Sequence, residues 1–231
     1  MRRLLLCVLL AFLLLTGLNC FSQQTDVRQF STFGAFSYFS TPSLNLTQRG
    51  FDGDFGYNWN SWLTLGFDFS YGNGHSTLLP SKLNAATQAK LAPYLPIFQE
   101  LGIPLAVPYN SSTYTYEAGP QFNYRHFKKV TLFVRPALGA LHGTFTATPD
   151  NPYIAQVVSG LLNGKTSSSD TVVFYGFGGG ITYEMTPNFG LRVATDLVHF
   201  NYFSNILDGG RNTVRVVVGT KFSFGKNILG K

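Results

Sequence analysis

The clearest pattern in the chain is the alternation of apolar and polar side chains in residues 213–224, T-V-R-V-V-V-G-T-K-F-S-F. One set of alternate positions carries valines followed by Phe222 and Phe224, and the other carries Arg215, Lys221 and small residues. A period of two predicts a β-strand with two unlike faces. Because the minority face carries charge, we expect it to line the inside of a closed barrel while the apolar face meets lipid.

The same alternation recurs along the chain, although aromatic residues fall on both faces of the first strand. The eight predicted strands cover residues 28–40, 51–59, 63–71, 114–124, 130–145, 171–184, 189–203 and 213–224. Short turns interleave with longer loops, which is typical of an outer-membrane barrel with both chain ends in the periplasm. We therefore predict an all-β fold, an eight-stranded antiparallel up-and-down transmembrane β-barrel. Pro120 cannot donate to a ladder and is expected at a β-bulge.

The two longest connections, residues 72–112 and 146–170, carry signals for short helices. In the first, Ser81 is expected to cap a helix that Pro93 breaks. In the second, Asn151 is expected to cap a helix that ends at Asn163-Gly164. The predicted barrel therefore has short helices in two long loops.

Composition agrees with an outer surface that is not water. Charged residues make up 12% of the chain, against about 25% in typical soluble domains. Past the N-terminus, no apolar run approaches the roughly 20 residues of a membrane-spanning helix. A membrane protein without spanning helices must be a closed barrel, because every backbone polar group must be paired in lipid. Aromatic residues at both ends of the strands predict two interfacial belts, formed by Tyr57, Trp59, Trp62, Tyr124 and Phe127 at one end and by Tyr71 and Tyr114 at the other.

Residues 1–22 have the features of a secretory signal peptide. A basic start precedes an unbroken apolar run, residues 4–15, whose length suits the central region of a signal peptide and is short for a membrane span. Cleavage after Ser22 leaves residues 23–231 as the barrel domain.

Both cysteines fall in the predicted signal peptide. The alternative is a lipoprotein with Cys20 lipidated, but Asn19 stands directly before it, where a small residue is expected. Removal of Cys7 and Cys20 leaves no thiol, so we expect neither a disulfide nor a cysteine metal site.

The formal charge of +6 does not point to nucleic acid. Nucleic-acid binding requires a clustered basic face, and Lys128-Lys129 is the only adjacent basic pair after the predicted signal peptide. We predict no nucleic-acid partner.

Charged residues on the minority face of the strands predict a lumen ion-pair network. Its members are Asp52, Asp54, Asp68, Glu117, Arg135, Glu184, Arg192, Asp196, Arg215 and Lys221. The interior of an eight-stranded barrel is only just filled by side chains, and a lone buried charge costs several kcal/mol, so these groups must pair. We expect Arg215 and Lys221 to pair with acids such as Asp52 and Asp54. The network is predicted to plug the barrel; the alternative is a narrow polar conduit. Glycines 176, 178 and 180 make room either for long side chains or for a void.

Two further arrangements of polar residues have a catalytic or metal-binding alternative. His75, His142 and His199 lie near the outer ends of three strands and are either a metal site or three unrelated rim residues. Asp196, His199 and Ser204 form the only constellation for a rim enzyme acting on lipid, and no nucleophile motif surrounds any serine. We predict no enzyme, no metal and no cofactor.

Several stretches resemble one known family. They are residues 51–71, E-A-G-P-Q-F-N-Y-R at 117–125, F-V-R-P-A-L-G-A-L-H-G at 133–143, G-F-G-G-G-I-T-Y at 176–183 and R-V-A-T-D at 192–196. The chain is similar to the eight-stranded outer-membrane β-barrel family related to the transmembrane domain of outer-membrane protein A. The resemblance implies a bacterial outer-membrane location, outer-membrane lipid as a partner, and recognition of the C-terminal strand at Phe224 by the outer-membrane assembly machinery. The six residues after Gly225 depart from the family pattern.

Together these patterns predict a monomeric outer-membrane barrel with a plugged polar lumen and a structural or surface-interaction role. The first alternative is a low-conductance channel for ions or small solutes, and the second is the rim enzyme.

Overall fold

The fold is a closed barrel in which each of eight antiparallel strands pairs with the next and the last pairs with the first. The computed structural model describes residues 24–229, and its strands are β1 Arg28–Thr41, β2 Leu46–Asn58, β3 Leu63–Leu78, β4 Val107–Tyr124, β5 Val130–Ala147, β6 Ser167–Thr186, β7 Phe189–Phe200 and β8 Arg211–Asn227. The predicted fold class is confirmed. The predicted signal peptide, with both cysteines, lies outside the described residues.

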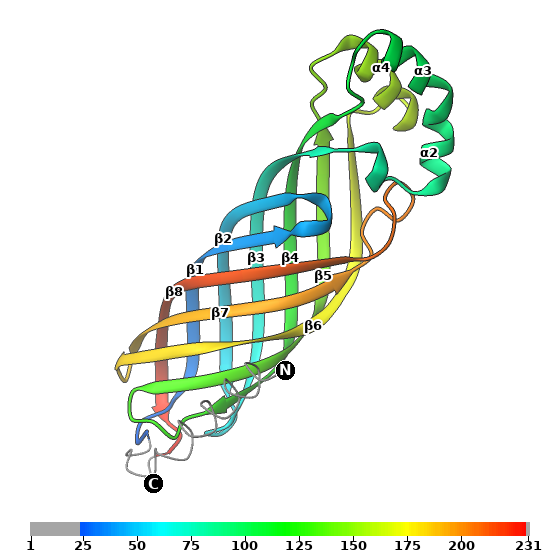
Figure 1. Cartoon of the computed structure of the whole chain (residues 1–231). Helices are drawn as coiled ribbons and strands as arrows, with labels where there is room; N and C mark the ends of the chain where they lie inside the picture. The colour runs from blue at the N-terminus through cyan, green and yellow to red at the C-terminus, as the bar shows by residue number, and fades with distance from the viewer. Residues whose placement is uncertain (1–23, 230–231) are drawn as a thin grey trace, which may run out of the picture.

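Four neighbouring strands, β3 to β6, run beyond the others at one end of the barrel (Figure 1). The predicted strands were too short there, since β3 continues past Tyr71 to Leu78 and β4 begins at Val107. The apolar alternation stops near Tyr71 because a strand that has left the lipid no longer needs an apolar outer face. The ladder continues nevertheless, for example through His75 paired with Asn110. This extension adds about 20 Å of strand.

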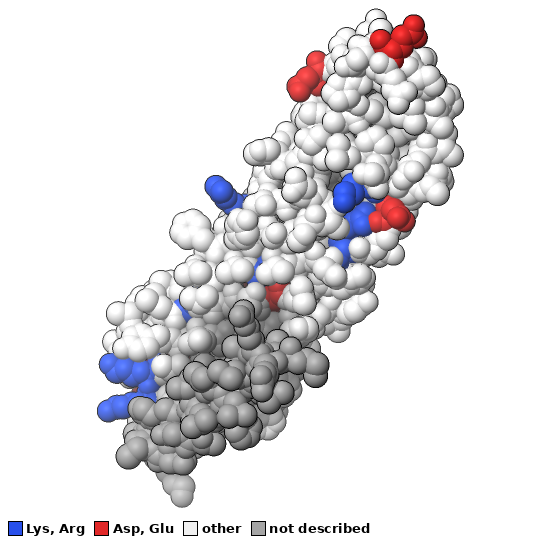
Figure 2. Space-filling view, viewed as in Figure 1, with Lys and Arg blue, Asp and Glu red and all other residues white. Residues whose placement is uncertain are grey.

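The two faces of the barrel wall differ as the alternation predicts. Outward side chains such as Val193 and Phe222 are apolar and exposed, whereas the inward positions are buried. The first strand, whose pattern left its faces undecided, turns Phe33 and Phe39 inward and leaves Phe36 84% exposed on the outer wall. In Figure 2 most of the visible wall is white and charged side chains are sparse.

Exposed aromatic side chains lie where the two predicted belts require them. Beside the short turns, Trp59 and Trp62 are exposed, and Trp62 stacks on Phe122 with 6.2 Å between ring centroids. Toward the opposite end, the rings of Tyr71 and Tyr114 are 4.9 Å apart. Amphipathic aromatic rings favour the membrane–water interfaces, so these residues delimit the lipid-facing band.

The loops contain short helices: η1 Pro42–Leu44, η2 Pro80–Lys82, α2 Ala85–Leu91, η3 Ala92–Tyr94, α3 Leu95–Glu100 and α4 Pro152–Leu161. The prediction that Ser81 caps the first helix is wrong, because Ser81 lies within η2. The cap of α2 is Asn84, whose side chain accepts a hydrogen bond from the Thr87 N–H at 2.8 Å. Asn151 caps α4 as predicted. Within residues 24–229, no helix is both long and apolar enough to cross a membrane.

Pro120 does not lie at a β-bulge, contrary to the prediction. The β4–β5 ladder is interrupted over residues 118–121 and resumes in unchanged register. In this register Pro120 of β4 lies opposite Pro136 of β5 within the interrupted stretch, and neither proline has an N–H to donate. On its other side, Pro120 remains in register with Leu65 of β3.

The residues after Phe224, which the family pattern leaves unexplained, pair with the segment before β1. The Asn227 side chain accepts the Val27 N–H at 3.0 Å, and the Ile228 N–H donates to the Val27 carbonyl at 2.8 Å. The end of β8 is therefore hydrogen-bonded to the segment that enters β1.

The loops at 79–106 and 148–166 fold together over the strand extension, and we call them the cap (Figure 1). Phe98 of α3 packs with Ile154 and Val158 of α4 and with Ala147 of β5. Where the cap meets the barrel, a second apolar cluster joins Leu83 and Leu91 of the cap to Phe145, Phe174 and Phe203. Apolar side chains from the cap and the barrel thus pack together across the barrel mouth.

Candidate functional site

The ten predicted lumen residues all form ion pairs inside the barrel, in three groups. The central cluster contains Arg135, Arg215, Asp52, Asp68, Glu117 and Asp196. The other two groups are the pairs Arg192–Asp54 and Lys221–Glu184. Alternation along β2 to β8 aims all of these side chains inward, which is why residues far apart in sequence meet.

Arg215 is the hub of the central cluster. Its guanidinium lies 2.7 Å from Asp68, 2.7 Å from Asp196, 3.1 Å from Asp52 and 3.2 Å from Glu117. Charge-assisted hydrogen bonds of this kind are strong, so this side chain of β8 is bound to four other strands across the lumen.

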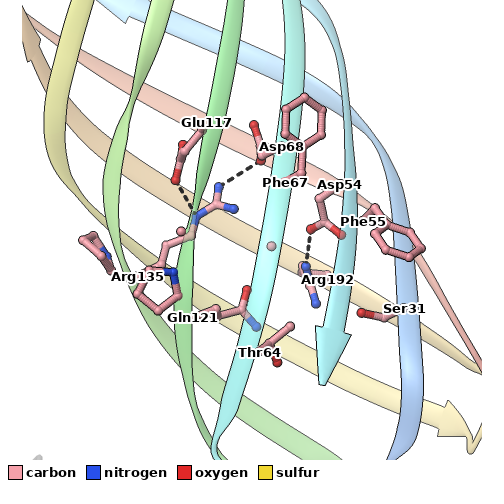
Figure 3. A pocket seen from close by; sticks show the side chains of 15 residues that line it. Ser31, Asp54, Phe55, Thr64, Phe67, Asp68, Glu117, Gln121, Arg135 and Arg192 are labelled. Carbon is pink, nitrogen blue, oxygen red and sulfur yellow. Dashed lines mark hydrogen bonds and ion pairs between the residues drawn. The ribbon is translucent and has the colours of Figure 1, made fainter. Parts of the chain in front are cut away.

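Arg135 supplies the second cation of the cluster, and Figure 3 shows it between Glu117 and Asp68. It donates to both oxygens of Asp196, at 3.2 and 3.1 Å, and to Asp68 at 3.2 Å. Asp196 is 0% exposed, so its charge depends entirely on the two guanidinium groups.

The cluster holds more carboxylates than guanidinium groups. Four acids share Arg135 and Arg215. Asp52 is the least well held: it contacts only Arg215, and its Oδ1 is buried without a hydrogen-bond partner. This asymmetry makes the arginines harder to replace than Asp52.

The pair Arg192–Asp54 forms the next layer toward the short turns, with 2.5 Å between Nη1 and Oδ2 (Figure 3). The guanidinium lies 5.1 Å from the ring centroid of Phe33 and 5.0 Å from that of Phe133. Ring faces attract cations, and two rings fill the lumen beside the pair.

The sequence-based pairing of Lys221 was wrong. Arg215 does contact Asp52 as expected, but Lys221 binds Glu184 at 2.6 Å. Asp54 is instead held by Arg192. Glu184 and Lys221 lie in one row across β6, β7 and β8 with Gly190 between them, and the absence of a side chain at Gly190 lets the two charged groups meet.

The inward glycines of β6 leave room for side chains, not for a continuous void. A Cβ at Gly178 would lie 1.7 Å from Oδ1 of Asp196, and one at Gly180 would lie 2.8 Å from the Phe133 ring. Gly178 therefore lets the Asp196 carboxylate reach its arginines.

Cavities inside the wall are small where the ion pairs lie and larger at the mouth. A space of about 20 Å³ adjoins the Arg192 and Arg135 layers, and one of about 30 Å³ lies between Arg215 and the outer apolar cluster. At the short-turn end, a cavity of about 370 Å³ is lined by residues that include Arg125, Lys128 and Lys129.

Arg125, in the turn after β4, keeps its positive charge in this cavity. Burial lowers the pKa of its guanidinium to about 10, so the side chain remains a cation at neutral pH.

A second closure of the lumen was missed by sequence reasoning. The predicted seventh strand was too long: β7 ends at Phe200, and the chain then turns so that Tyr202 and Phe203 enter the barrel mouth. Phe203 is 1% exposed, has a φ of +51°, and donates its N–H to Asp170 at 2.7 Å. The available signal was the run F-N-Y-F at 200–203, whose aromatics break the alternation.

The histidines and the candidate rim triad do not assemble. His142 contacts Thr171, and His199 contacts Asn212. Asp196 is committed to the lumen cluster, three residues from His199 and on the opposite face of the same strand. In the described part of the chain, no three His, Cys, Asp or Glu side chains are grouped so that they could hold a metal ion.

Comparison with solved structures finds similar folds at low sequence identity. Ail, the attachment invasion locus protein of Yersinia pestis, is 19% identical, with 84% of this chain and 96% of that chain covered and a TM-score of 0.43. OprG of Pseudomonas aeruginosa is 10% identical, with 88% and 99% covered and a TM-score of 0.47. A major outer membrane protein of Thermus thermophilus is 12% identical, with 84% and 99% covered and a TM-score of 0.46. No curated protein matches the chain.

Comparison with protein families gives a match over most of the sequence. The family described as outer membrane protein beta-barrel domain matches residues 8–222. The eight-stranded closed topology, the apolar outer wall and the inward ion pairs all agree with this family. The chain therefore belongs to the family of outer membrane protein β-barrel domains and is a protein of the bacterial outer membrane.

Proposed function

We propose that the protein acts at the cell surface as a closed, monomeric barrel that holds the cap outside the membrane, with a binding role and no catalytic one. The observation that carries this proposal is the filling of the lumen at successive depths. Ion pairs cross the lipid-spanning part, and the apolar cluster around Phe203 occupies the outer mouth.

The cap supports a binding role because it is folded, not merely long. Its helices share a buried core with β5, and the β3–β6 extension carries that core beyond the aromatic belt. Several large apolar side chains at the tip remain exposed, among them Tyr94, Ile97, Leu101 and Tyr153. Exposed apolar residues that gather on one surface mark interaction sites more often than scattered ones do.

The test replaces the cap and leaves the barrel. Residues 79–106 and 148–166 are each exchanged for a short glycine-serine turn. Cells displaying this variant are compared with cells displaying the native protein for adherence to other cells and to surfaces. We expect adherence to fall to the level of cells without the protein. Heat-modifiable migration in gels verifies that the barrel is intact. Unchanged adherence with an intact barrel would refute the proposal.

A low-conductance channel is the second candidate, favoured by one observation. Water-sized spaces lie on both sides of the central cluster, so displacement of its arginines would join them. Steady openings that grow on Arg192→Ala or Asp196→Ala would support this alternative over the closed barrel.

The remaining partners follow from the same proposal. The exposed apolar wall requires outer-membrane lipid. We infer that assembly machinery recognises β8, whose outward aromatics Phe222 and Phe224 lie at the short-turn end. Substitution of Phe224 by serine should then slow insertion in cells but not folding into vesicles without the machinery.

A further inference from the structure

A large cavity on the outer side of the barrel lies between the cap and the strand extension. Its volume is about 740 Å³, within the roughly 300–1,000 Å³ of small-molecule sites. Helices α2 and α4, the inner face of β5, the start of β6 and the loop at 201–210 all line it. The cavity is therefore enclosed by several elements of the fold and not by one loop alone.

The walls of this cavity are of two kinds. One wall is apolar and includes Leu91 of α2, Val107 of β4 and Val158 of α4. The other wall is polar and consists of the turn and strand start at residues 163–169, with Lys165 and three serines. A ligand that satisfies both walls must itself have an apolar part and a polar part.

The charge of the lining favours an anion. Lys90 and Lys165 line the cavity, no Asp or Glu lines it, and neither lysine forms an ion pair within residues 24–229. Ammonium groups without acidic partners attract carboxylate, sulfate or phosphate. Both lysines are exposed, so an anion can reach them from solvent.

The cavity continues along one side of α4. A neighbouring groove of about 510 Å³ shares Lys90, Val157, Gly160 and Leu161 with it and runs on past Tyr153. The two spaces therefore meet along one helix, with Lys90 where they join. An elongated apolar chain fits this shape better than a compact ligand does.

From these observations, we propose that the cap binds an amphipathic anion with a long apolar chain, of the class of long-chain fatty acids. Its chain lies along α4 against the apolar wall, and its anionic group lies by Lys90 and Lys165. This inference rests on the proposed surface-binding role and specifies the chemistry of the ligand.

The test uses fluorescence quenching in the full chain, folded into lipid nanodiscs. A reporter indole is introduced by Tyr153→Trp, with Trp59→Phe and Trp62→Phe to remove the two native tryptophans. Dibromostearic acid is the quenching probe, and its methyl ester is the uncharged control. The native chain reports partition into the bilayer, because its tryptophans lie in the membrane belt at the far end of the barrel.

The matched variants act on the two walls separately. Gly160→Phe fills the groove, because a Cβ at position 160 meets nothing within 4 Å, and Ser159→Phe places the same ring beside it on α4 but outside the lining of either cavity. Lys90→Gln combined with Lys165→Gln removes the charge and leaves the apolar wall.

We expect the acid to quench the reporter at a concentration about tenfold below that needed for the native tryptophans, and the ester to show no such preference. Gly160→Phe should abolish the preference, Ser159→Phe should keep it, and the double lysine variant should make acid and ester equal. Equal quenching of reporter and native tryptophans, or indifference to Gly160→Phe, would overturn the proposal. Neither result depends on adherence, so the two proposals fail separately.

Discussion

Replacement of Arg215 should be far more damaging than replacement of its partner Asp52. Arg215→Met leaves four buried carboxylates with Arg135 alone, and Asp52 loses its only cation. Removing one partner from a buried ion pair costs about 3–5 kcal/mol, because an uncompensated charge remains. We expect a loss of this size in the free energy of unfolding.

Asp52→Asn should cost about 1 kcal/mol or less. It exchanges an ion pair of 3.1 Å for a hydrogen bond from the Arg215 guanidinium to an uncharged amide oxygen, a difference of about 1 kcal/mol. It also removes a negative charge from a cluster that has too many. The two single variants should therefore differ by about 3 kcal/mol, or roughly 100-fold in the folding equilibrium.

Urea titration in lipid vesicles measures both values, with the folded fraction given by the faster migration of unheated samples in gels. The double variant Arg215→Met/Asp52→Asn should be less destabilised than the sum of the singles, because the asparagine removes the carboxylate that the methionine leaves unpaired. Equal single costs, or strict additivity, would refute the idea that excess acid sets the energetics of the lumen.

Three further predictions test the wall, the glycine contact and the mouth. Gly178→Ala should destabilise the barrel by about 1–3 kcal/mol, because its Cβ meets the carboxylate opposite, whereas Gly34→Ala, with nothing within 4 Å, should be neutral; equal effects in urea titration would contradict this. Val193→Arg on the lipid face should cost about 2–4 kcal/mol and His199→Arg near the outer rim about 0–1 kcal/mol; the reverse order would place the membrane elsewhere. Phe203→Ala should cost about 3–5 kcal/mol without opening the lumen, and steady bilayer currents from it would show that the ion pairs alone do not close the barrel.

The sequence predicts the lipid-spanning part of this fold well because lipid imposes a strict rule there. Every second side chain must be apolar, so strand number, face and turn order can be inferred from a period of two. Where the strands extend beyond the lipid, their outer faces need not be apolar, and the predicted strand ends are wrong. Beyond Tyr71 the strands continue with mixed residues such as Asn73 and His75 on their outer faces, and the prediction ended them early.

Membership of the lumen network follows from the same alternation, but partners do not. Alternation says that Lys221 faces inward, whereas the strand registers decide that it meets Glu184, two strands away across Gly190. The apolar mouth is less predictable still. Phe203 reaches it through a turn with positive φ, and neither its position nor the packing around it has a periodic signal.

Single-channel recording of the full chain in planar bilayers tests the central claim most directly. If ion pairs and apolar residues close the lumen, the folded protein should give no steady openings at high salt, while a large porin recorded in parallel does. Steady, salt-dependent openings from a chain verified as folded would contradict the closed barrel.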